Sequence, residues 1–151
     1  MDPVGVVVDV GGVTRSGRGT VFAPIYVAVP GCKDFPQPPW HDFVVVVLGA
    51  FAQAAHTAVS SAAARPLVHF MEGPFAVRIA CTGAELEIEL IERGTAKSAG
   101  RIDRRRFLES ILHSGDAVLS ACRERKWWSE DEDSLEAAMD VLRIDIRRLS
   151  S

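Results

Sequence analysis

The strongest constraint on the fold is a strict alternation of charged and apolar residues in the middle of the chain. From Glu85 to Leu90, every odd position is glutamate and every even position is leucine or isoleucine. Because successive side chains of a β-strand point to opposite faces, this pattern predicts a strand with one face in solvent and the other packed. The chain is therefore expected to contain a sheet that is covered on one side, which argues against a purely helical fold.

Further segments favour strands because they are rich in β-branched residues or alternate in the same way. The expected strands are residues 4–10, 21–29, 67–71, 75–81 and 85–90. The first two flank a polar, glycine-punctuated loop and form an opening hairpin, and residues 94–100 are expected to form a loop. Short connections between neighbouring strands predict an antiparallel arrangement.

Prolines decide where the first helix can begin. The three prolines of residues 36–39 hold the chain extended, because proline fixes φ and restricts the residue before it. A helix can start only after them, with Asp42 or the preceding turn as its cap, and Pro66 closes it. The consecutive valines of residues 44–47 favour a strand by propensity, so burial in the tertiary structure has to override them.

Two more amphipathic helices end the chain. Asp103 can cap the first of them, and Ser129 with Glu132 predicts a capping box for the second. The element order is ββαβββαα, which predicts an α+β fold with a mainly antiparallel sheet of about five strands and three helices packed on one face. The sequence shows no internal repeat or long linker, so residues 1–151 are expected to form a single domain.

Composition excludes several classes of partner. The chain has 17 lysines and arginines against 20 aspartates and glutamates, so its formal charge is −3 and it lacks the positive field that binds nucleic acid. The most apolar window, residues 43–59, is shorter than the roughly 20 residues that cross a bilayer, which predicts a buried helix and no membrane partner. The first residues lack a secretory signal pattern and the three cysteines are widely spaced, so a cytoplasmic location is expected.

The motifs predict no cofactor. Gly17 and Gly19 match the first two glycines of a dinucleotide fingerprint, but Phe22 occupies the third position and a strand follows, so a hairpin loop explains them. The histidines, cysteines and nearby acids lack the paired spacing of zinc sites, and hydrogen-bonded or solvated histidines are the simpler interpretation. The candidate ligands are His41, Asp42, His56, His69, Glu72, His113, Cys32, Cys81 and Cys122. No metal, nucleotide or covalent cofactor is therefore expected.

Two residue sets have the chemistry for catalysis, but no motif forces their geometry. Cys32, His41 and Asp42 can supply a nucleophile, a base and an orienting group. The glutamates of residues 85–90 share a strand face, as a carboxylate site requires, but solvated pairing with Arg78 on the neighbouring strand is the favoured explanation. We predict that the chain is not an enzyme, and a small cytosolic enzyme of unknown reaction stays as an alternative.

Two segments on either side of the first helix carry a resemblance to a known family. They are residues 35–43, Phe-Pro-Gln-Pro-Pro-Trp-His-Asp-Phe, and residues 68–77, Val-His-Phe-Met-Glu-Gly-Pro-Phe-Ala-Val. With the layout of residues 5–125, they resemble the immunity proteins of bacterial polymorphic and contact-dependent toxin systems. The resemblance implies a single α+β domain that binds a cognate protein toxin stoichiometrically and blocks it in the producing cell. The same segments also fit structural roles, with Trp40 as a lid on the core and residues 72–74 as a hairpin turn.

An inhibitor of this kind needs an exposed binding surface. The best candidate joins two tryptophans to a run of acids: Trp127, Trp128, Glu130, Asp131, Glu132 and Asp133. A tryptophan anchor ringed by charge is typical of tight interfaces, and the acids would steer a toxin with a basic groove. A helix start with solvated acids and inward-packed tryptophans explains the same residues, and the glutamate face of residues 85–90 is the next candidate. The oligomeric state stays open, and a subunit of a larger assembly is a further alternative.

Overall fold

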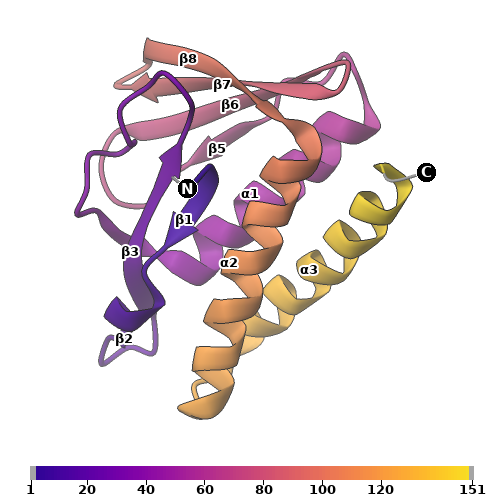
Figure 1. Ribbon diagram of the computed structural model, residues 1–151. Coiled ribbons are helices and arrows are strands. Elements are labelled where there is room, and N and C mark those ends of the chain that lie inside the picture. The colour runs from indigo at the N-terminus through magenta and orange to yellow at the C-terminus, as the bar shows by residue number, and fades with distance from the viewer. Residues whose placement is uncertain (1–2, 150–151) are drawn as a thin grey trace.

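The computed structural model describes residues 3–149 and confirms the α+β class (Figure 1). Its α-helices are α1 (Val44–Ser60), α2 (Arg104–Glu124) and α3 (Glu130–Leu149), and a short 3-10 helix, η1, covers Val10–Gly12. Two four-stranded antiparallel sheets lie within the described residues, instead of the single sheet of about five strands that the element order predicts.

The first sheet is built around one long strand. Its strands are β1 (Gly5–Val8), β2 (Thr14–Arg15), β3 (Val21–Ala28) and β4 (His41–Phe43), and β3 pairs with each of the others. The predicted antiparallel pairing of β1 and β3 is confirmed, but the connection between them also contains η1 and β2. The Asp9 side chain accepts from the Gly11 N–H at the start of η1, and β2 then pairs beside Phe22 of β3.

The second sheet corrects one expectation about a loop. It has the order β5 (Leu67–His69), β6 (Phe75–Thr82), β7 (Glu85–Glu92) and β8 (Thr95–Asp103). The loop that the sequence predicts over residues 94–100 is wrong, because the strand β8 already begins at Thr95. Arg93 and Gly94 both have positive φ, at 52° and 78°, which is the geometry of a two-residue hairpin turn. Most of β8 is exposed, so its backbone pairs with β7 without producing an apolar alternation in the sequence.

The helix starts follow two of the three predicted caps. Asp103 accepts from the Arg106 N–H at the start of α2, as predicted. At α3, the Ser129 hydroxyl accepts from the Asp131 N–H and donates to the Glu132 carboxylate, a variant of the predicted capping box. Asp42 does not cap α1: it belongs to β4, and no side chain caps that helix.

Helix α1 lies at the centre of the fold. It packs against both sheets and against α2 and α3, and one buried cluster draws residues from all of these elements. Burial explains why the valines of residues 44–47 are helical, since three of the four are almost inaccessible to solvent. In Figure 1 the β5–β8 sheet lies above the helices, and α2 and α3 run side by side below it. None of the helices within residues 3–149 has both the length and the apolar character required to cross a bilayer.

The two segments that carry the family resemblance meet at a buried carboxylate. Asp42 is completely buried and accepts from the Trp40 indole at 3.0 Å and from the N–H groups of Met71 and Glu72, both at 3.1 Å. Trp40 packs edge to face on Phe75, with ring centroids 4.9 Å apart, so its predicted role as a lid is confirmed. We call residues 40–43 and 70–75 the Asp42 corner.

Candidate protein-binding surface

The connection from α2 to α3 carries both predicted tryptophans. Trp127 and Trp128 are half-buried and pack against the core. The Arg123 guanidinium lies 4.6 Å from the centre of the Trp128 ring, and that of Arg125 lies 5.2 Å from the Trp127 ring. The Trp128 indole also donates to Asp133 at 2.8 Å. Each ring therefore has partners within the chain, and each keeps part of its surface in solvent.

The four acids of the run do not share one environment. Glu130, Asp131 and Asp133 are exposed on the first turn of α3, where carboxylates complement the helix dipole. Glu132 is only 2% exposed, and its carboxylate accepts from the Ser129 hydroxyl. A partner can therefore reach three of the four predicted acids. We call residues 127–133 the α3 end.

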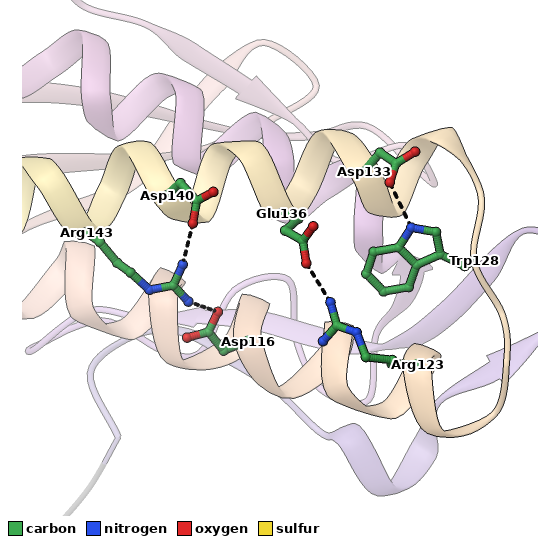
Figure 2. A network of polar contacts seen from close by, with 7 residues as sticks. All are labelled: Asp116, Arg123, Trp128, Asp133, Glu136, Asp140 and Arg143. Carbon is green, nitrogen blue, oxygen red and sulfur yellow. Dashed lines mark hydrogen bonds and ion pairs between the residues drawn. The ribbon is translucent and has the colours of Figure 1, made fainter.

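Ion pairs hold one side of α3 against α2 (Figure 2). Arg143 of α3 donates to Asp116 of α2 at 2.6 Å and to Asp140 at 2.8 Å. The hydrogen bond to Asp116 raises the pKa of Arg143. Closer to the α3 end, Arg123 of α2 pairs with Glu136. These contacts direct one face of α3 towards α2, which fixes how its remaining surface meets α1.

A groove of about 420 Å³ lies between α1 and α3. Its walls are mainly apolar, and Val46 and Val141 on its rim are 37% and 40% exposed. Asp131 lines the groove together with Val46, so the groove is continuous with the acidic α3 end. The amphipathic patterns predict both helices but not that they are neighbours, so sequence reasoning missed this groove.

A histidine and an aspartate connect the two helices further along the groove. Nδ1 of His56 on α1 lies 2.7 Å from a carboxylate oxygen of Asp145 on α3. Asp145 is 5% exposed, whereas the His56 side chain is 42% exposed and lines the groove. Since Asp131 lies beside the start of α1 and Asp145 beside its later turns, α1 and α3 run in the same direction.

Two arginines on the neighbouring strands compensate part of the charge on the glutamate face of β7. Arg78 of β6 lies 3.8 Å from Glu89, and Arg101 of β8 lies 3.9 Å from Glu85 and 3.8 Å from Glu87. The cross-strand pairing that Arg78 predicts is therefore confirmed, and Arg101 extends it. This face offers a partner less uncompensated negative charge than the α3 end.

Two residues considered for catalysis, Cys32 and Asp42, and one considered as a metal ligand, Cys122, have contacts of their own within the fold. The Cys32 thiol donates to the Ala99 carbonyl at 3.5 Å, while Asp42 is saturated by donors of its own corner. Burial, and then the nearby Glu132 carboxylate, raise the pKa of the Cys122 thiol to about 11. That thiol is protonated at neutral pH and is not an activated nucleophile. Within residues 3–149, no group of three or more histidines, cysteines and acids is placed to hold a metal ion.

Comparisons with protein-family models, with curated proteins and with solved structures give no significant match.

Proposed function

We propose that this protein is a toxin-neutralising immunity protein, which binds a cognate bacterial toxin stoichiometrically in the cytoplasm of the producing cell. The resemblance of residues 35–43 and 68–77 to immunity proteins suggests this function. The Asp42 corner gives part of these segments a structural role, so we assign the binding surface to other exposed residues of the molecule.

The observation that carries the proposal is the continuity of exposed acids with an apolar groove. Asp131 lines a groove whose rim leaves Val46 and Val141 in solvent, and Glu130, the residue before it, is exposed. Exposed carboxylates accelerate encounter with a basic partner, and burial of apolar side chains slows its release. A toxin that binds a polyanionic substrate has a basic groove of the complementary charge.

A kinetic experiment with matched charge variants tests the acidic surface. The protein encoded by the gene immediately upstream serves as the probe, and its association is measured from about 50 to 500 mM salt, a range in which screening grows strongly. The test variant removes the three exposed acids (Glu130→Gln, Asp131→Asn and Asp133→Asn) and keeps the buried Glu132. The control removes three charges from β7 (Glu85→Gln, Glu87→Gln and Glu89→Gln).

We expect the test variant to associate about tenfold more slowly and with a flatter salt dependence, because electrostatic steering is lost. The β7 control should associate at the wild-type rate, since its glutamates already lie beside arginines. If the upstream protein is not toxic, or is not neutralised on coexpression, the proposed function is wrong. A chain that forms a homo-oligomer and covers the groove would instead support the assembly-subunit alternative.

A further inference from the structure

We infer that the groove between α1 and α3 receives an amphipathic α-helix of the partner, about three turns long, with lysine or arginine at the end that lies beside Asp131, the residue that follows the exposed Glu130. This inference rests on the proposed function, because it names the segment of the partner that the same surface would bind.

The dimensions of the groove match a short helix. Its wall on α1 runs from Val45 to His56, which at about 1.5 Å per residue is a length of roughly 16 Å. The wall on α3 runs in the same direction from Asp131 to Val141. Two neighbouring helices with an open seam between them offer the ridges and grooves that a third helix can fit.

Small residues in both walls leave space within the groove between α1 and α3. Gly49 lies in the interior of α1, where glycine costs about 1 kcal/mol of helix stability relative to alanine. A Cβ atom added at Gly49 would meet nothing within 4 Å, so no close contact within the described chain requires glycine there. Ala138 lines the same groove from α3. The space is therefore available to side chains from outside the chain.

The nature of the walls favours a helix over an extended peptide. An extended peptide gains its affinity by pairing its backbone with a free sheet edge. The walls here are side chains of two helices, whose backbone groups are already paired within each helix. A helical occupant satisfies its own backbone and can place an apolar stripe against Val46 and Val141.

The exposed acids at one end of the groove favour an occupant with basic residues at that end. Within residues 3–149, the Glu130 and Asp131 side chains have no ion pair to a lysine or arginine. A second copy of the chain would bring the same acids and a net charge of −3, so a basic partner complements this end better. The groove and the acids together therefore point to a cationic amphipathic helix.

Synthetic peptides test the groove without the toxin. The probe is a fluorescent 14-residue helical peptide with leucines at helical spacing and lysines at one end, and its counterpart has glutamates in place of the lysines. Binding is measured by fluorescence anisotropy at low salt. We expect the lysine peptide to bind at least about tenfold more tightly than the glutamate peptide, because only the former complements the acids.

Variants that fill the groove locate the binding site. Ala138→Trp fills it from α3, and Gly49→Leu fills it from α1, where the added side chain meets open space. Ala137→Trp is the matched control, because Ala137 is exposed on α3 outside the groove lining. Both filling variants should weaken binding of the lysine peptide by at least about tenfold, and the control should leave it within about twofold. Circular dichroism and thermal melting verify that each variant is folded.

The outcomes separate this inference from the proposed function. Equal binding of the two peptides, or wild-type binding by both folded filling variants, overturns the inference. A dimer of the chain that displaces the lysine peptide overturns it too, because the second copy is then the occupant. If the filling variants neutralise the upstream toxin as well as the wild type, the groove is not the toxin site while the proposed function stands. If peptide binding behaves as expected but the wild type does not neutralise that toxin, only the proposed function fails.

Discussion

Tryptophan indoles donate to aspartates at two places in this chain, from Trp40 to Asp42 at 3.0 Å and from Trp128 to Asp133 at 2.8 Å. The two contacts have nearly the same length but different surroundings. Asp42 is completely buried and also accepts from backbone N–H groups of two segments, whereas Asp133 is exposed on the first turn of α3. Burial of the carboxylate and the number of its donors therefore decide how much each aspartate stabilises the fold, and the length of the shared bond does not.

The largest expected effect comes from removing the buried carboxylate. Asp42→Ala leaves the Trp40 indole and the N–H groups of Met71 and Glu72 without their acceptor, so we expect a loss of about 4 kcal/mol of unfolding free energy. Asp133→Ala should cost less than about 1 kcal/mol, because its donor can bind water. Urea denaturation measures both changes. Equal losses would mean that the two pairs do not differ as their burial indicates.

A glycine pair measures how tightly Trp40 closes the corner. Gly73 has a φ of 76°, and an added Cβ would lie 2.8 Å from the Trp40 ring. Gly73→Ala combines left-handed backbone strain with displacement of the indole, so we expect a loss of about 2 kcal/mol. Gly83 has a φ of 65° but open space around it, and Gly83→Ala should cost only the strain, about 1 kcal/mol. Equal losses of stability in the two variants, measured by thermal unfolding, would show that the Trp40 ring moves aside without cost.

The pH dependence of stability tests the burial of the Cys122 thiol of α2 next to Glu132 of the α3 end. The folded chain holds the Cys122 proton more tightly than an unfolded chain does, because burial and Glu132 raise its thiol pKa to about 11. This contribution is complete below the ordinary thiol pKa and is lost as the pH rises through about 11. Relative to Cys122→Ala, the wild type should lose about 1 kcal/mol between neutral pH and about pH 10. A constant difference between the two proteins across that range would contradict the shift.

The smallest expected effect is in the ion pairs of Figure 2. Arg143→Gln breaks the contacts with Asp116 and Asp140, but all three side chains are at least 38% exposed. We expect a loss of at most about 1 kcal/mol, which should shrink as added salt screens the wild-type pairs. Urea denaturation with and without about 1 M salt measures this difference. A larger loss of unfolding free energy that salt does not change would mean that these ion pairs stabilise the fold as a buried group such as Asp42 does, and not as surface pairs do.

The local sequence pattern was sufficient to predict an element where the element has a regular alternation of side chains or a clear capping residue. The alternation of residues 85–90 predicts β7, and Asp103 predicts the start of α2. It failed for β8, because an exposed edge strand needs no apolar alternation and its turn depends on positive φ at Arg93 and Gly94. The local pattern also failed for Asp42. It predicts a helix cap, but the Asp42 carboxylate instead accepts from the backbone N–H groups of residues 71 and 72, which are distant in the sequence.

The candidate surface was predicted only in part. The acid run and the tryptophan pair are adjacent in the sequence, so their proximity at the α3 end needs no tertiary information. The sequence does not show that Glu132 turns inward while its neighbours stay exposed, because that depends on the rotation of α3 against α1 and α2. The groove depends on the same packing, since its walls come from α1, which ends at Ser60, and α3, which begins only at Glu130.

The sequence by itself determined the α+β class, the three helices and the strands with regular alternation, because each follows from contacts between residues close along the chain. The tertiary structure alone decided that the strands divide into two sheets, that Asp42 joins two distant segments, and that α1 and α3 enclose a groove ending at Asp131. These features depend on which faces pack together, and a periodic pattern states that a face is apolar without stating what covers it.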